Sequence, residues 1–191
     1  MVPLKNISRL ALFVAVLSLV SAYFVPLWRI LLWAPQYPEG LEMKIWINTL
    51  TGDVKIISAL NHYIGMKHIE VSMFPEFGYM VFLLGGIIAV GLGAVVWGKR
   101  RGLLVYFILL VATALAALVD FYLWGYDYGH NLNPEAAIKI EGMSYQPPLI
   151  GTKDLLNFTA FSGPDLGGWI FILSGILVLG IELYEWRVSK K

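Results

Sequence analysis

Three side chains that can bind a soft metal ion lie close together in the chain: His62, Met66 and His68. His62 and Met66 are four residues apart, so on a helix they would share one face. Imidazole and thioether form a donor set that copper accepts, Cu(I) above all, whereas hard ions are poorly served by it. Lys67 lies inside this cluster and would repel a cation. The alternative is that the histidines form a surface pair while Met66 fills the core.

The third histidine, His130, follows the third long apolar run of the chain. Asp127 is three residues away, and its carboxylate could orient the imidazole of His130 by a hydrogen bond while that imidazole binds a metal. His130 would then belong to the metal site. The same stretch is rich in turn formers, and Gly129 at a positive φ would make it a hydrogen-bonded turn instead. Met143 is a further candidate soft donor.

Asp120 is the one acidic residue within an apolar run, shortly before Trp124. An ionisable residue in a membrane helix is a functional candidate by default, here for a proton relay or an ion site. Its place near the end of the run argues against that role, because there the carboxylate can reach water. A small transporter or channel that uses Asp120 is therefore the weakest of three functional hypotheses.

Composition shows which elements must position these residues. The chain has 191 residues, 58% of them hydrophobic and 14% charged, which is more apolar surface than a soluble domain of this length could bury. An apolar helix of about 20 residues spans a bilayer. We therefore predict an all-α membrane protein, a single polytopic domain over 1–191, with four transmembrane helices and two outer loops. The helices are expected over about 10–32, 79–97, 103–124 and 166–186, and the loops over 33–78 and 125–165.

The charge pattern predicts the orientation, because cytoplasmic flanks carry an excess of Lys and Arg. The short segments 1–9, 98–102 and 182–191 hold eight basic residues, whereas the much longer segments 29–78 and 125–165 hold six. Both termini should therefore be cytoplasmic and all three histidines extracytoplasmic, in the inner membrane of a bacterium. A basic inner rim suits anionic lipids rather than nucleic acid. Cleavage of the first helix as a signal peptide before Tyr23 stays open, and it would leave the loops where they are.

The spacing of apolar residues predicts regular secondary structure in both outer loops. Alternating apolar residues predict strands over 41–47 and 69–73, and three-to-four-residue spacing predicts a helix from Asp53 to Gly65. In the second loop, 153–161 favours a short interfacial helix. Loops this long are usually functional or packed on one another, so we expect them to form one small cap over the helices.

Several functional classes have no support. The chain has no cysteine, which excludes disulfides and thiolate metal sites. The predicted membrane helices contain no histidine for a b-type haem. Neither a phosphate-binding glycine loop nor a nucleophile elbow is present, so nothing indicates an enzyme.

Three stretches carry a resemblance to a known family: residues 60–66 (LNHYIGM), residues 128–134 (YGHNLNP) and residues 143–151 (MSYQPPLIG). In these and in its helix arrangement, the chain resembles a family of small bacterial membrane proteins found in gene neighbourhoods for copper enzymes. Those neighbourhoods are notably the ones that mature periplasmic nitrous oxide reductase. The resemblance implies an accessory role in copper handling, enzyme assembly or electron supply, with a membrane or periplasmic protein as partner. It carries over no ligands, so His62, Met66, His68 and His130 rest on donor chemistry alone.

The main alternative belongs to another class of protein. The chain could be a structural or anchoring subunit of a membrane respiratory complex that binds no metal. Its two loops would then pack against protein partners.

Overall fold

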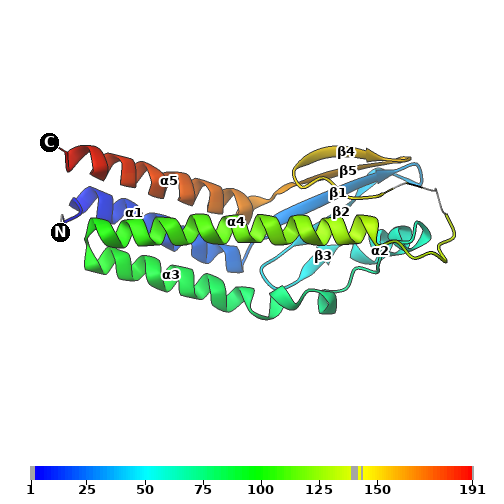
Figure 1. Ribbon diagram of the computed structural model, residues 1–191, viewed down its shortest axis with the longest axis horizontal. Helices are drawn as coiled ribbons and strands as arrows, with labels where there is room; N and C mark the ends of the chain where they lie inside the picture. The colour runs from blue at the N-terminus through cyan, green and yellow to red at the C-terminus, as the bar shows by residue number, and fades with distance from the viewer. Residues whose placement is uncertain (1–2, 139–141, 143, 191) are drawn as a thin grey trace.

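Two parts stacked end to end make up the computed structural model, which describes residues 3–138, 142 and 144–190. Four long helices form a bundle, and a small sheet with a short helix forms a cap at one end of it (Figure 1). The start of α1 and the end of α5 lie together at the opposite end, here called the base of the bundle (Figure 1). The protein is thus mostly helical but not all-α.

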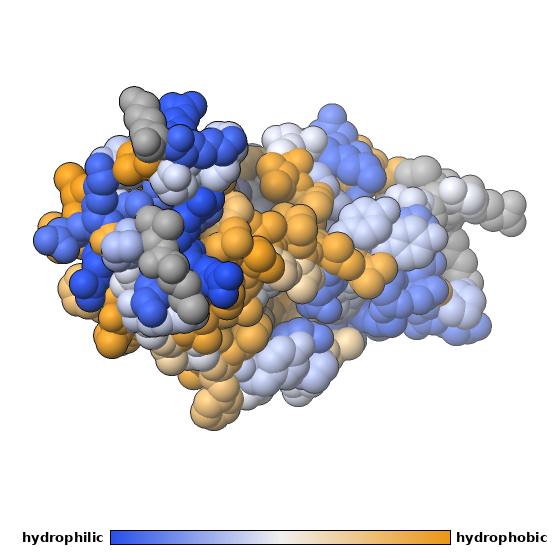
Figure 2. Space-filling view, turned by 60° about the vertical axis from the view of Figure 1, so that its left-hand side comes forward, coloured by the Kyte–Doolittle hydropathy of each residue, from blue (hydrophilic) through white to orange (hydrophobic). Residues whose placement is uncertain are grey.

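The bundle has the properties of a membrane domain. Its four helices are long and apolar enough to cross a bilayer: α1 (Asn6–Ser18), extended by the 3-10 turn η1 (Leu19–Tyr23), α3 (Met80–Trp97), α4 (Arg100–His130) and α5 (Leu166–Val188). Leu12, Leu84 and Val178 pack in its interior, whereas Phe82, Leu115 and Ile176 point outward and are more than half exposed. Figure 2 shows apolar surface as a band over the bundle, between two more polar ends. A bilayer would cover that band.

Helix α4 connects the two parts. It runs back from α3 after a tight turn at Gly98, whose φ is +61°. It has 31 residues against 18 in α3, so its last dozen residues pass the start of α3 and lie beside the sheet (Figure 1). The outer end of α4 therefore belongs to the cap.

The cap joins both outer segments in one antiparallel sheet of order β3-β2-β1-β5-β4. Its strands are β1 (Trp28–Ala34), β2 (Tyr37–Ile45), β3 (Leu50–Gly52), β4 (Gly151–Leu155) and β5 (Phe158–Pro164). Helix α2 (Val54–Tyr63) packs on β2, and the turns η2 (Val71–Met73) and η3 (Pro75–Gly78) lead into α3. A core of its own, including Ile30, Met43 and Tyr128, is separate from the core of the bundle. The expected single cap is present.

Three sequence predictions were wrong in the cap. The first helix does not continue to residue 32: it ends at Tyr23, Pro26 follows, and Trp28–Ala34 becomes the central strand. Residues 153–161 form the β4–β5 hairpin rather than an interfacial helix. Residues 69–73 contain a 3-10 turn rather than a strand. In the first two cases the stretch gains a pairing partner that is distant in sequence, because β1 pairs with β5.

Other predictions are confirmed closely. α2, α3 and α5 begin and end within two residues of the expected bounds, and β2 covers most of the strand predicted over 41–47. Helix α4 (Arg100–His130) begins before and ends after the expected range 103–124.

Two buried glutamates of α5 hold the base of the bundle together. Glu185 Oε1 accepts hydrogen bonds from the backbone N–H of Lys5 (3.1 Å) and from the Ser8 hydroxyl (2.5 Å) at the start of α1. Glu182 Oε1 lies 2.8 Å from the guanidinium of Arg100, at the start of α4. Both carboxylates thus lie at helix N-termini, where negative charge is favoured.

Candidate functional site

The structure brings two of the three histidines together. The rings of His62 and His68 stack with centroids 4.8 Å apart and planes 21° apart. His62 is on the last turn of α2, and Gly65, at φ +85°, reverses the chain after it. The Gly65 N–H donates to His62 O (3.1 Å) and the Met66 N–H to Asn61 O (3.0 Å), a Schellman motif. This turn returns the chain so that His68 covers His62.

Both histidine side chains are exposed, and His68 is held in place. Its Nδ1 lies 3.2 Å from Ser58 Oγ, and that hydroxyl also accepts the Ile69 N–H at 2.9 Å. The backbone carbonyl of His68 accepts a hydrogen bond from the Tyr128 hydroxyl. The imidazole of His68 is therefore anchored to α2 and its backbone to α4.

Met66 lies on the other side of this turn. Its side chain is buried in the cap core together with Met43, so it does not share an exposed face with His62. The chain reverses at Gly65 before the helical spacing can bring the two together. Met73 is exposed in η2, and Met143 lies outside the described residues. Copper binding by His62 with Met66 stays a prediction, but the surface donors are His62 and His68.

Lys67 does not present a free charge to this pair. Its Nζ lies 2.5 Å from Asp127 Oδ2, on the part of α4 that belongs to the cap. This hydrogen bond, with a second from the Asn131 side chain, lowers the pKa of the Asp127 carboxyl. The repulsion expected between Lys67 and a bound cation is therefore partly neutralised. Asp127 is committed to Lys67 and Asn131, and it does not orient His130.

His130 is the last residue of α4 and is exposed. Its ring stacks on Tyr126 at 3.9 Å, and its Nδ1 lies 2.9 Å from the carbonyl oxygen of Tyr126. The turn expected here is absent: Gly129 is helical, and the backbone of Gln146 packs directly against it. His130 is thus on an ordered helix end, engaged with its own helix.

The donors do not form a complete metal cage. Within the described ranges, no group of three or more His, Asp or Glu side chains is arranged to hold a metal ion. The lone pair of an imidazole lies in the ring plane, so two stacked rings cannot direct their nitrogens at one ion until one ring turns. The His62–His68 pair can therefore offer two donor nitrogens at the surface. The remaining coordination positions of a bound metal ion would be filled by another molecule.

Asp120 is at the boundary between bundle and cap. It is exposed on α4. Glu76 of η3 is close enough to act on it electrostatically. The sequence alone could not show this neighbour, since Glu76 precedes α3 in the outer segment.

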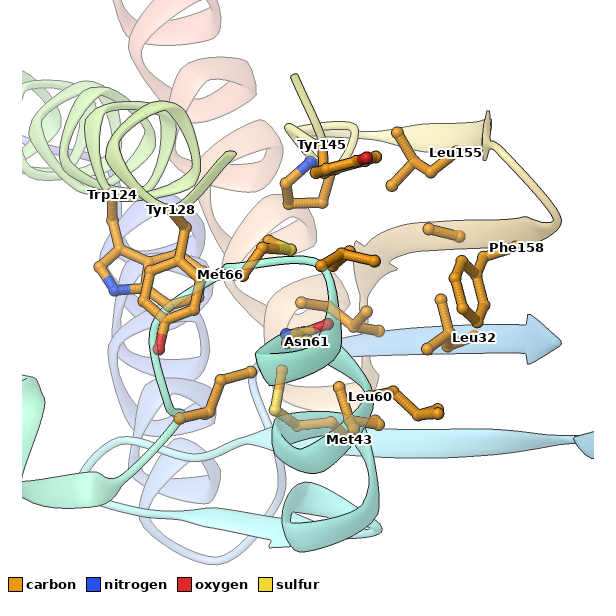
Figure 3. Close-up of a pocket in the computed structure, with 16 residues that line it drawn as sticks. Leu32, Met43, Leu60, Asn61, Met66, Trp124, Tyr128, Tyr145, Leu155 and Phe158 are labelled. Carbon is orange, nitrogen blue, oxygen red and sulfur yellow. The ribbon is translucent and has the colours of Figure 1, made fainter. Parts of the chain in front are cut away.

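A cavity inside the cap had no signal in the sequence. It has a volume of about 60 Å³, and its 16 lining residues come from α2, α4, the sheet and both outer segments (Figure 3). Met43, Met66 and Tyr145 are among them. Such residues look like ordinary core formers in a sequence, because only the assembled fold leaves space between them.

Comparisons of this chain with protein-family models, curated proteins and solved structures gave no significant match. Any function must therefore be argued from the cap itself.

Proposed function

We propose that this chain is an accessory membrane protein that acts through its cap, on the extracytoplasmic side of a bacterial inner membrane. The proposed role is copper handling or assembly for a periplasmic copper enzyme, such as nitrous oxide reductase. The observation that carries the proposal is the exposed His62–His68 pair, with ring centroids 4.8 Å apart. Imidazole is a ligand that copper accepts, which makes copper the first metal to test.

The surroundings of the pair suit transfer better than storage. A metal held by two imidazoles keeps positions open for a donor from a partner protein, whereas a closed four-ligand site would retain it. The turn at Gly65, the Ser58 hydroxyl and the Lys67–Asp127 ion pair hold the two histidines near each other. The backbone is then already in place when the metal arrives, and the turn of one imidazole ring is the ordering step that remains.

Competition titration of Cu(I) against a chromophoric chelator, on the purified full chain, tests this proposal. We expect one Cu(I) per chain, with affinity falling at least tenfold in His62→Ala and in His68→Ala. His130→Ala is the matched control, because it removes another exposed imidazole from the cap and should leave the affinity unchanged. Equal affinity in all four proteins would reject the site.

A second candidate function is that of an anchoring subunit that binds no metal. The burial of Met66 in the cap core favours it, because this removes the soft sulfur donor from the surface. In that case a partner should co-purify with the full chain and be retained by the His62→Ala/His68→Ala double variant. Loss of the partner in the double variant would argue for the metal role.

A further inference from the structure

The hydroxyl of Ser58 lies between helix α2 and the returning segment that carries His68. Ser58 is on α2, about one helical turn before His62, and it is only 6% exposed. Its Oγ accepts a hydrogen bond from the Ile69 N–H at 2.9 Å and lies 3.2 Å from His68 Nδ1. Within the described residues, this hydroxyl makes no other hydrogen bond. These two contacts therefore have to satisfy it.

The two contacts determine which nitrogen of His68 carries the proton. The Ile69 N–H can only donate, so the Ser58 oxygen accepts there, and the hydroxyl still has its own proton to donate. Buried polar groups nearly always have a partner, and His68 Nδ1 is the acceptor within reach. The lone pair of Nδ1 therefore faces Ser58, and the proton of the neutral ring is on Nε2.

His130 has the opposite arrangement and serves as an internal reference. Its Nδ1 lies 2.9 Å from the carbonyl oxygen of Tyr126. A carbonyl oxygen only accepts, so in this ring Nδ1 carries the proton. A histidine that binds a metal through Nε2 usually donates its Nδ1–H to a carbonyl or a carboxylate in this way. His68 lacks that arrangement, because its neighbour is a hydroxyl that has a proton to donate.

A metal ion at His68 would deprive the Ser58 hydroxyl of its acceptor. If Nδ1 binds the ion, its lone pair is no longer available to Ser58. If Nε2 binds the ion, the ring proton moves from Nε2 to Nδ1, and Nδ1 then donates to Ser58 Oγ. The protein neither gains nor loses a proton in either case. In both cases the hydroxyl proton of Ser58 has lost the acceptor that it has in the metal-free protein.

We propose that Ser58 is a positioning residue that holds metal-free His68 in the Nε2–H form and thereby weakens metal binding by the His62–His68 pair. The ring of His62 makes no hydrogen bond within the described residues and only stacks on His68, so it is the ring that turns. A metal ion bound against this opposition is released more readily to a partner. The proton assignment stands on hydrogen bonds alone, whereas its effect on copper rests on the proposed function.

Nitrogen-15 NMR of the metal-free full chain, labelled only at histidine, tests the proton assignment. In mildly alkaline buffer, in which an imidazole is neutral, we expect the proton on Nε2 of His68 and on Nδ1 of His130. Single His→Gln variants assign the three rings. In Ser58→Ala the His68 ring should show both forms, whereas Ser58→Thr keeps the hydroxyl and should match the wild type. A proton on Nδ1 of wild-type His68, or an unchanged His68 spectrum in Ser58→Ala, would overturn the assignment.

Competition titration with Cu(I) tests the effect on the metal. Ser58→Ala should bind Cu(I) about two- to tenfold more tightly than the wild type, the range expected for one hydrogen bond, and Ser58→Thr should bind like the wild type. Ser72→Ala is the matched control, because it removes an exposed hydroxyl from the same outer segment.

Two results of this titration have different meanings. If the wild type binds Cu(I) and Ser58→Ala binds it equally or more weakly, Ser58 does not oppose the metal and the proposed effect is wrong. If the wild type binds no Cu(I), the copper proposal fails together with this effect, and the NMR spectrum still decides the proton assignment.

Discussion

At the scale of single residues, Gly129 decides how the two outer segments meet. A Cβ atom there would lie 2.3 Å from the backbone nitrogen of Gln146 and 2.4 Å from its Cα. The Gly129 carbonyl also accepts the Tyr145 N–H at 2.9 Å. Only the missing side chain lets the second outer segment lie flat on α4, which in turn positions Tyr145 in the cavity wall.

Gly129→Ala should therefore destabilise the protein, against the usual trend for a glycine in a helix. Alanine normally stabilises a helix by about 1 kcal/mol relative to glycine, but here the clash should cost about 1–3 kcal/mol, as for overpacked cores. Gly125→Ala, one turn earlier, is the matched control, since its Cβ would meet only Pro147 Cγ at 3.9 Å. Thermal unfolding in one detergent measures both. A Gly129→Ala protein as stable as Gly125→Ala would refute this packing.

Residue types alone identified the donors but could not say which way they face. His62 and Met66 have helical spacing, yet Gly65 ends the helix between them and directs Met66 inward. Lys67 looked repulsive because its partner, Asp127, is 60 residues away. Gly129 looked like a turn residue because its actual constraint, the backbone of Gln146, is distant in the chain. For Lys67 and Gly129 a contact far along the sequence decided the outcome, whereas for Met66 the local chain reversal at Gly65 did.

At the scale of elements, the local sequence pattern was sufficient to predict an element whose start and end are marked by residues within it or beside it. Helix α2 was predicted within two residues because its apolar spacing and its terminal glycine are local signals. Strand β1 was missed because Trp28–Ala34 is a short apolar run, which periodicity cannot distinguish from the end of a membrane helix. The β4–β5 hairpin was missed since Leu156 occupies a turn position at φ +59°, where glycine or asparagine would have marked the turn.

Contacts between elements at the base of the bundle make a second prediction. Replacing Glu185 with alanine leaves the Ser8 hydroxyl, in a residue only 3% exposed, and the Lys5 N–H without their acceptor. We expect a loss of about 1–3 kcal/mol, the cost of leaving buried groups unpaired. Glu185→Gln should fall between alanine and wild type, because its amide oxygen still accepts but carries no charge. Thermal unfolding, with α1 intact in all samples, measures the series. Indistinguishable melting temperatures would contradict a stabilising role of the hydrogen bonds that Glu185 accepts from the start of α1.

At the scale of the whole molecule, the two ends of the protein differ in charge and in construction. The base carries the basic residues that flank the bundle, including Arg100, Arg101 and Arg187, while the other end carries a folded cap with its own core. The sequence predicted this division from hydropathy and charge, which are summed properties that need no knowledge of contacts. The pairing of β1 with β5, which unites the two outer segments, needed the fold.

The orientation of the whole molecule in the membrane gives the last prediction. Because the chain has no cysteine, a single introduced thiol reports its own location. Asn157→Cys, in the β4–β5 turn, and Asn6→Cys, at the start of α1, replace two exposed asparagines at opposite ends of the molecule. A membrane-impermeant maleimide added to bacterial spheroplasts should label Asn157→Cys at once and Asn6→Cys only after lysis, since basic flanks stay in the cytoplasm. The reverse pattern would place His62 and His68 in the cytoplasm, where they could not serve a periplasmic enzyme.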